Sequence, residues 1–312
     1  MAGQTLVARY GTRVIAAAAL VGLVVPDAAE VLRPHIGNLV VTMLIVSLLR
    51  VDFDAFVARM RRPAPAIIAA GWITLVLPLL VLAVASVSPL GGATVLAVLF
   101  LFSAPPPIAS AAAFAMLMGL DGAFVLAVML IATVGAPLTA PAIASLFVAD
   151  TLPIGVLDLA SRLFIMIAIA LAVATLARRT LGRARIDRAA PVLDTVSVLI
   201  ATLFAIGAMD GVGVRLVTEP FVVLGAACAA FAFMLAQLAL TYFAFRPFVG
   251  ADAVAIAYAA GNRNAGLVIA ALGVHAVSDT VWLYFALSQL PVFMFPWLLA
   301  PIGRRLAART RP

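Results

Sequence analysis

Long runs of apolar residues, separated by short polar segments, extend over the whole sequence. About 20 apolar residues are enough for an α-helix to cross the hydrocarbon core of a bilayer, whereas the ten-residue alternation of a membrane β-barrel is absent. The pattern therefore predicts an all-α integral membrane protein, with polar loops at 26–35 and 50–63 and a polar linker at 177–190. The ten predicted spans are residues 14–25, 36–49, 64–87, 93–119, 122–148, 152–176, 192–209, 221–245, 254–274 and 280–299.

Two of these predicted spans are interrupted near the middle. Pro105, Pro106 and Pro107 divide the fourth span, because proline lacks the backbone N–H that a helix interior uses. Gly261 and Gly266 flank an Asn-Arg-Asn sequence in the ninth span, and glycine allows the backbone to open. The alternatives are that the prolines only kink one helix and that the glycines only allow close packing of the other.

Arg263 is the most unusual residue of the sequence, because it lies in the middle of an apolar span. A charged side chain at the centre of a membrane helix costs roughly 2.5–3.5 kcal/mol on insertion scales, so it needs a partner or a water-filled cavity. We expect this arginine to brace the helix break by donating to backbone carbonyls, to contact a bound anion, or to do both.

The ten predicted spans divide evenly about Asp150. Five spans per half is an odd number, so residues 1–150 and 151–312 would enter the membrane from opposite sides, as inverted repeats within one membrane domain. The interrupted span is the fourth of each half. Paired interruptions at corresponding positions are typical of secondary transporters, whose binding sites lie where the two breaks meet. The sequence thus favours a transporter that works by alternating access.

Composition and charge agree with a membrane location. Apolar residues make up 66% of the chain and charged residues 11%, whereas soluble domains have roughly half and a quarter. All 20 basic residues are arginines, and 16 of them fall on the side that holds both termini. Because cytoplasmic segments carry the excess of positive charge, we expect a multi-pass protein of the cell membrane with both termini in the cytoplasm. The basic charge therefore reflects topology and does not indicate a nucleic-acid partner.

Few residues are available for enzymatic or metal chemistry. The sequence has no HExxH, P-loop or serine–histidine motif, so we expect neither an enzyme nor a cofactor or metal site. Cys228 is the only cysteine, which excludes a disulfide within the chain.

Two further expectations concern residues away from the breaks. Asp158 and Arg162, four residues apart on the sixth span, are expected to form an ion pair. Trp282, Tyr284 and Trp297 lie near predicted helix ends, where aromatic side chains anchor membrane proteins in the lipid headgroups.

Several short motifs resemble those of the bile acid/sodium symporter superfamily in order and spacing. Gly261, Asn264 and Leu267 match positions of its E-x-G-x-Q-N-x-x-L motif, and Pro105 and Ser110 match its P-G-G-x-x-S-N motif. The resemblance implies a ten-helix inverted-repeat fold, in which a panel domain faces a core domain that contains the crossing helices 4 and 9. It also implies secondary transport of a small organic anion. Further similarity lies at 43–53, 61–63 and 77–79.

The sequence departs from this family at the sodium-binding positions. Ala259 replaces the motif glutamate, Arg263 replaces the glutamine, and Ala111 replaces the asparagine of the other motif. Sodium requires several oxygen ligands, so we expect transport without sodium coupling, with Arg263 as a fixed charge in place of the ion. Uniport, exchange, proton coupling and a sodium symporter with altered ion sites stay open. So do a channel and an arsenite-type exporter, although that exporter needs a thiol at the crossing.

The candidate substrate site consists of residues at the two breaks. An arginine and two amides in an apolar cavity suit a carboxylate with an apolar body. The substrate itself, the direction of transport and the oligomeric state stay open. The expected substrate-binding residues are Arg263, Asn264, Asn262, Ser110 and Ile108, and the expected crossover backbone is Pro105, Pro106, Pro107, Gly261 and Gly266.

Overall fold

The computed structural model describes residues 6–89, 91–117, 120–250 and 253–310, and within them it is helical, with no strand. The side chains of residues 6–10, 12, 53, 113–114, 117 and 296–310 lie outside this description. The elements are α1 (Leu6–Val24), α2 (Pro26–Leu32), η1 (Arg33–His35), α3 (Ile36–Leu49), α4 (Phe53–Met60), α5 (Ala64–Gly71), η2 (Trp72–Val76), α6 (Leu77–Ser86), α7 (Ala93–Ser103), α8 (Ala111–Leu117), α9 (Gly122–Phe147), η3 (Ala149–Thr151), α10 (Val156–Leu181), α11 (Arg183–Arg188), α12 (Ala190–Ala208), α13 (Val212–Thr218), α14 (Pro220–Val249), α15 (Ala253–Gly261), α16 (Ala265–Leu272) and α17 (Asp279–Thr310).

Among the described residues, six helical segments are long and apolar enough to cross a membrane. The expectation of an all-α membrane protein is confirmed at this level. The two interrupted spans are not among the six, because each is divided into shorter helices. The six segments are Pro26–Leu49, Ala64–Ser86, Gly122–Phe147, Val156–Leu181, Ala190–Thr218 and Pro220–Val249.

The expectation of loops at the three polar segments is wrong for most of their length, although residues 50–52 and 61–63 are non-helical. Residues 26–35 form α2 and η1, since Pro26 occupies the first turn of α2, where its missing N–H costs nothing. Residues 53–60 form α4, whose first turn is capped by the carboxylate of Asp52. The linker is helical as well, because α10 continues to Leu181 and α11 begins at Arg183. Gly182 separates the two with a φ of 75°, which favours glycine.

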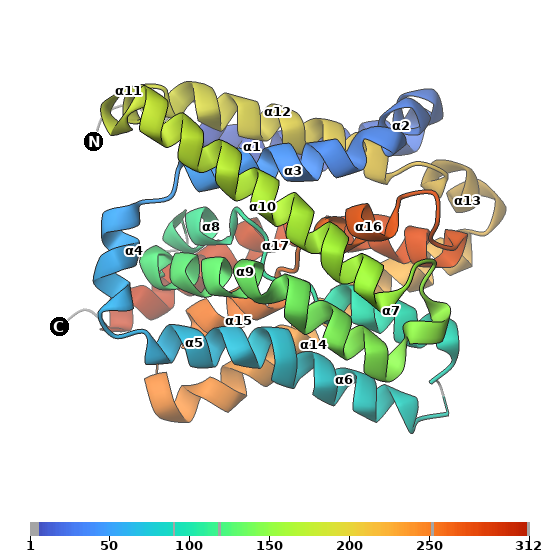
Figure 1. The fold of residues 1–312 in the computed structure, drawn as a ribbon. Coiled ribbons are helices and arrows are strands. Elements are labelled where there is room, and N and C mark those ends of the chain that lie inside the picture. The colour runs from blue at the N-terminus through green and yellow to red at the C-terminus, as the bar shows by residue number, and fades with distance from the viewer. Residues whose placement is uncertain (1–5, 90, 118–119, 251–252, 311–312) are drawn as a thin grey trace.

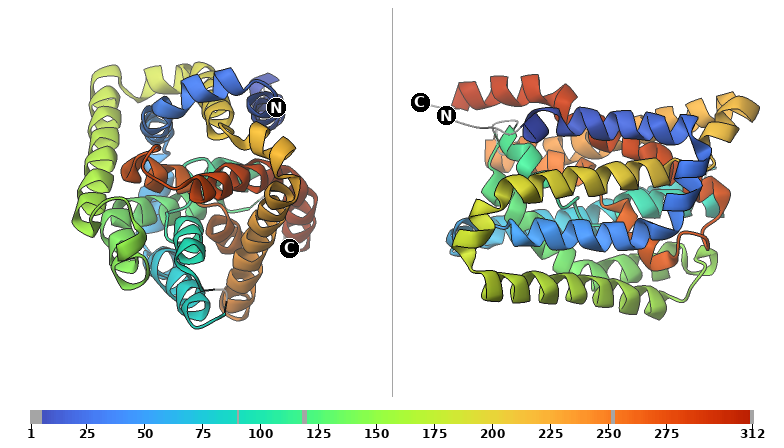
Figure 2. Two further views of the ribbon diagram at one scale, coloured as in Figure 1. Left: turned by 90° about the vertical axis from the view of Figure 1, so that its right-hand side faces the viewer. Right: turned by 90° about the horizontal axis from the view of Figure 1, so that it is seen from above.

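The helices fall into two groups (Figure 1). The smaller group comprises α1, α2, α3, α10 and α12, which pack against one another. The larger group comprises α5, η2, α6, α7, α8, α9, α14 and α15, and α16 and α17 lie between the groups and contact both. The groups also touch directly, because α10 of the smaller group packs along α9 of the larger one. Figures 1 and 2 place the start of α1 and the end of α17 at the same end of the molecule, together with α4 and α11. We call this the arginine-rich end, and the other the α2/α13 end.

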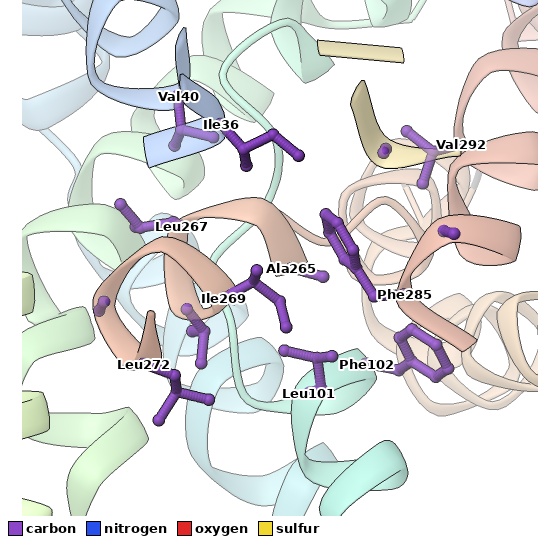
Figure 3. Packing of buried hydrophobic residues seen from close by; sticks show 14 of the residues in the cluster. Ile36, Val40, Leu101, Phe102, Ala265, Leu267, Ile269, Leu272, Phe285 and Val292 are labelled. Carbon is purple, nitrogen blue, oxygen red and sulfur yellow. The ribbon is translucent and has the colours of Figure 1, made fainter. Parts of the chain in front are cut away.

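The short helix α16 is buried on all sides at the boundary between the groups. Figure 3 shows Leu267 and Ile269 of α16 between Ile36 and Val40 of α3 and Leu101 of α7. A helix that is apolar around its whole circumference is stable only inside a protein or a membrane. The burial of α16 therefore fixes the position of the helix break that precedes it.

A cluster of four residues joins the smaller group to α16 and α17 at the α2/α13 end, and we call it the outer cluster: Arg33, Asp210, Val274 and Trp282. Arg33 Nη1 lies 3.0 Å from Asp210 Oδ2, and Arg33 Nη2 donates to the Val274 carbonyl at 3.0 Å. The Trp282 indole N–H donates to the Asp210 carbonyl at 3.0 Å. The Arg33 guanidinium lies over the Trp282 ring, with its Cζ 4.1 Å from the ring centroid. Trp282 is only 3% exposed, so the expectation that it anchors in the headgroups is wrong. Trp297 lies outside the described side chains.

The expected ion pair of Asp158 and Arg162 is not formed. Arg162 instead donates to the carbonyl of Ala271 at 3.2 Å, near the end of α16. The last carbonyls of a helix have no N–H donor within that helix. The guanidinium of Arg162 supplies a donor to one of them. This contact ties α10 of the smaller group to α16.

Candidate functional site

The two breaks meet and pair with each other as two short antiparallel strands would. Ile108 N donates to the Asn262 carbonyl at 2.9 Å, and Asn264 N donates to the Pro106 carbonyl at 2.8 Å, on either side of a bridge between Pro107 and Arg263. Backbone groups freed by a helix break inside a membrane must find such partners. The prediction that residues 105–107 and 262–264 interrupt their helices is thus confirmed, and the structure brings the two interruptions together.

Gly261 and Gly266 do not open the backbone themselves. Gly261 ends α15 and Gly266 belongs to the first turn of α16, and neither has a positive φ. The chain leaves the helix at Asn262 and Arg263, and the side chain of Asn264 then caps α16 by accepting from Leu267 N at 3.2 Å. Gly266 therefore matters for packing, as the alternative interpretation of the sequence had it, whereas Gly261 has room for a Cβ.

The guanidinium of Arg263 joins three parts of the larger group. Nη1 donates to the Pro105 carbonyl at 3.2 Å and to the Ile73 carbonyl at 2.8 Å. Nε and Nη2 donate to Oε1 of Gln237 on α14, at 3.3 and 3.2 Å. The expected bracing role of Arg263 is thus confirmed. It holds the break after α7 against α14 and against the distorted segment η2.

The Ile73 carbonyl is available because the helix is irregular at this point. Residues Trp72–Val76 form a π-helical turn, η2, in which a carbonyl is normally paired with the N–H five residues later. The residue five positions after Ile73 is Pro78, which has no N–H. A buried carbonyl without a donor costs about 1–3 kcal/mol, and the guanidinium of Arg263 supplies the missing donor.

Gln237 is a site residue that the sequence reasoning missed. It is buried on α14, accepts from Arg263, and donates through Nε2 to the Phe102 carbonyl at 3.2 Å, at the last turn of α7. One amide therefore connects both interrupted helices to α14. The signal in the sequence is an isolated glutamine within a long apolar span, where polar side chains are costly and tend to serve a function.

Arg263 is the only charged residue among the buried residues that the structure describes, and it is 4% exposed. Its acceptors are two backbone carbonyls and an amide, all neutral, and no described carboxylate forms an ion pair with it. A guanidinium stays protonated at neutral pH. The crossing of the two breaks therefore carries a net positive charge within an apolar interior.

A small cavity of about 40 Å³ lies beside this crossing, between the two helix groups. A cavity of this size holds a few water molecules at most. Its walls come from the two breaks, from α3 and α12 of the smaller group, and from α17. The lining residues are Val40, Met43, Leu44, Ile108, Ala109, Ser110, Phe204, Arg263, Asn264, Gly266, Gln289, Val292 and Phe293.

Four of the five expected substrate-binding residues line this cavity: Arg263, Asn264, Ser110 and Ile108. The acceptors of the Arg263 guanidinium are not among the lining residues, so its charge acts through the wall of the cavity. Within the described chain the Ser110 hydroxyl and the Asn264 side-chain N–H groups donate to no protein acceptor, which leaves them free for a ligand.

Asn262 does not line the cavity. Its Nδ2 donates to the Tyr258 carbonyl at 3.0 Å, and its Oδ1 is buried without a partner among the described residues. Gln289 of α17 lines the cavity instead, and the sequence reasoning did not find it. Like Gln237, it is an isolated glutamine in an apolar span.

A second cavity, of about 380 Å³, lies at the α2/α13 end between α7, η3 and the turn from α16 to α17. It is large enough for a small organic molecule. Among the described residues that line it, none is charged, and the polar ones are hydroxyls such as Thr94, Thr151 and Ser278. The small cavity at the crossing therefore remains the candidate site for an anion.

The positions at which the resembled family binds sodium are packed with hydrocarbon. Ala111 and Ala259 are both fully buried in one apolar cluster, together with Phe124, Val125 and Val128 of α9. These side chains offer no oxygen to a cation.

Gly266 and Gly261 provide a matched pair of substitutions. A Cβ at Gly266 would lie 3.1 Å from Phe204 and 3.2 Å from Val40, both on the smaller group, whereas a Cβ at Gly261 would make ordinary contacts, at 3.5 Å or more, with α14. We expect Gly266→Ala to lower the free energy of unfolding by about 1–3 kcal/mol, because overpacking in a well-packed interior costs that much. Gly261→Ala should change the free energy of unfolding by less than about 0.5 kcal/mol. Unfolding of the purified variants in detergent measures both, and equal effects of the two substitutions would contradict this role of Gly266.

No protein-family model and no curated protein matches the chain.

Proposed function

We propose that the protein is a secondary transporter that moves a small organic anion across the cell membrane by alternating access. One observation carries the proposal. Arg263 is a buried positive charge with only neutral acceptors, and it stands beside a cavity where two interrupted helices cross. A carboxylate in that cavity would neutralise the charge, and Ser110 and Asn264 would donate to its oxygens.

The two helix groups correspond, in this proposal, to the two moving parts of such a transporter. The smaller group is the panel domain and the larger group is the core domain, and together with α16 and α17 they make the ten spans of a 5+5 inverted repeat. The cavity lies at the boundary of the groups, between the breaks on one side and Val40, Leu44 and Phe204 on the other. Relative movement of the groups would enlarge it enough for an organic anion, since such sites measure about 300–1,000 Å³.

Transport proceeds without sodium in this proposal. Support comes from the apolar packing around Ala111 and Ala259 and from the position of Arg263, whose charge would repel a cation. The arginine-rich end faces the cytoplasm, as the distribution of charge along the chain favours. An arsenite-type exporter finds no support, because the side chain of Cys228 is exposed on α14.

Ligand-dependent thermal stability of the purified protein tests the function. We expect at least one carboxylate from a panel of organic acids to raise the denaturation temperature, because a ligand at 100 times its Kd stabilises by about 2.7 kcal/mol. The rise should be the same in sodium and in choline buffer, and the amide of the same acid should give none. A rise that requires sodium would contradict the proposed coupling, and equal stabilisation by acid and amide would contradict an anion site.

A further inference from the structure

We propose that the protein is an exchanger of monovalent organic anions. In this proposal the larger helix group moves quickly between its outward-facing and inward-facing positions only when an anion is bound beside Arg263. This inference rests on the proposed transport function and adds the mode of transport and the charge of the substrate. It follows from where the charge of Arg263 is held and from what surrounds it.

The charge of Arg263 belongs to one of the two groups. Its acceptors are the carbonyls of Ile73 and Pro105 and the amide of Gln237, which lie in η2, after α7 and in α14. All three segments belong to the larger group. A movement of the larger group against the smaller one therefore carries the guanidinium with it.

No other group in the described interior compensates this charge. The other buried residues with polar side chains are serines, threonines, glutamines, Asn262 and Tyr258, all of them neutral at neutral pH, and the two histidines, His35 and His275, are exposed. A carboxylate that took up and released a proton during the cycle could neutralise the arginine in one step, but none is buried among the described residues. The compensating charge must then come from the transported substrate.

Counting charge gives the mode of transport. The larger group carries +1 at the crossing when empty, 0 with a monovalent anion bound and −1 with a divalent anion. Closing an apolar cavity around a net charge is unfavourable, because the charge loses its hydration without gaining an opposite charge. Only the form with a monovalent anion is neutral when the cavity closes, so the loaded group moves in both directions and the empty group returns slowly.

Uptake of radiolabelled benzenesulfonate into proteoliposomes tests the mode. This monovalent anion with an apolar ring stays charged at all relevant pH values and leaks little through lipid. We expect uptake to be at least about tenfold faster into vesicles loaded with unlabelled benzenesulfonate than into empty vesicles. An inside-negative potential, set with potassium and valinomycin, should leave exchange unchanged and slow net uptake several-fold, because the empty step moves a positive charge outwards. Benzenedisulfonate inside the vesicles should not accelerate the uptake of labelled benzenesulfonate.

The outcomes separate the two proposals. Equal uptake into loaded and empty vesicles, or stimulation by the divalent anion, would overturn the exchange mode and leave a transporter. No uptake of benzenesulfonate, or of any carboxylate that stabilises the protein, into loaded vesicles would overturn both proposals.

Gln237→Glu places a carboxylate next to the guanidinium, because Gln237 Oε1 already accepts from Arg263 at 3.2 and 3.3 Å. The charge of the larger group is then compensated internally. We expect the ratio of uptake into loaded and empty vesicles to fall towards one and the effect of the potential to disappear. Gln237→Met is the matched control, since it removes the same hydrogen bonds without adding charge, and it should keep a high ratio at lower stability. If Gln237→Glu does not fold, the effect of the membrane potential on net uptake by the unaltered protein decides whether the exchange mode holds.

Discussion

Arg263→Gln is expected to weaken the binding of an organic anion by at least about tenfold. A positive charge attracts an anion by about 4 kcal/mol at ~4 Å and by about 2 kcal/mol at ~8 Å, at the effective dielectric constant of ~20 that suits protein sites. Since 1.4 kcal/mol corresponds to a factor of ten, the loss of the charge is a large effect even though the guanidinium acts through the cavity wall. Isothermal titration with the carboxylate identified by thermal stability measures it.

Arg263→Lys separates the charge from the bracing contacts. Lysine keeps the positive charge, but it lacks the planar fork that reaches Ile73, Pro105 and Gln237 together. We expect anion affinity to stay within a few-fold of the original while the protein loses about 1–3 kcal/mol of stability for each buried acceptor left without a donor. Equal loss of affinity in the lysine and glutamine variants would mean that the contacts of Arg263 matter and its charge does not.

Arg162→Gln is the control for both substitutions, because Arg162 is the other arginine that lies within a predicted span. It is exposed on α10 and donates to one carbonyl, that of Ala271. Its replacement removes a charge from the same membrane region but not from the crossing. Anion affinity should therefore change by less than about threefold.

The sequence alone predicts the interruptions well because their cause is local. Pro105, Pro106 and Pro107 cannot complete a helix, and a charged residue such as Arg263 in an apolar span signals a special environment without reference to any other helix. The membrane character is equally local, since it follows from the lengths of the apolar runs.

The partners at the crossing could not be predicted in this way, because they come from helices far apart in the sequence. Nothing near Gln237 indicates that its amide faces both Arg263 and the Phe102 carbonyl. The free carbonyl of Ile73 depends on a π-helical turn, which a pattern of apolar residues does not reveal.

Spacing along one helix misled where the observed partner lay on another helix. Asp158 and Arg162 have the spacing of an ion pair, but the end of α16 offers Arg162 a carbonyl. Trp282 lies near a helix end, as an interfacial tryptophan would, but the chain folds Arg33 and Asp210 over it. In both cases tertiary contacts decided between two arrangements that are locally equivalent.

Arg33→Ala is expected to open the α2/α13 end of the proposed transporter. Arg33 donates to the Val274 carbonyl between α16 and α17 and lies over Trp282 of α17, so these two contacts break when the smaller group separates from α16 and α17. Its ion pair with Asp210 lies within the smaller group. Hydrogen bonds to charged groups contribute about 1.5–3 kcal/mol, so their loss should shift the equilibrium towards the outward-open form at least about tenfold.

The shift is measured by labelling a cysteine at the cavity wall from outside the cell. Ser110→Cys, in a chain whose Cys228 is replaced by serine, reports access to the crossing through its reaction with a membrane-impermeant maleimide. We expect Arg33→Ala to raise the labelling rate about tenfold. Glu30→Ala, which removes an exposed charge from the same end without touching the outer cluster, should leave it unchanged. Unchanged labelling in Arg33→Ala would mean that the outer cluster only stabilises the fold, and that the α2/α13 end opens by breaking other contacts.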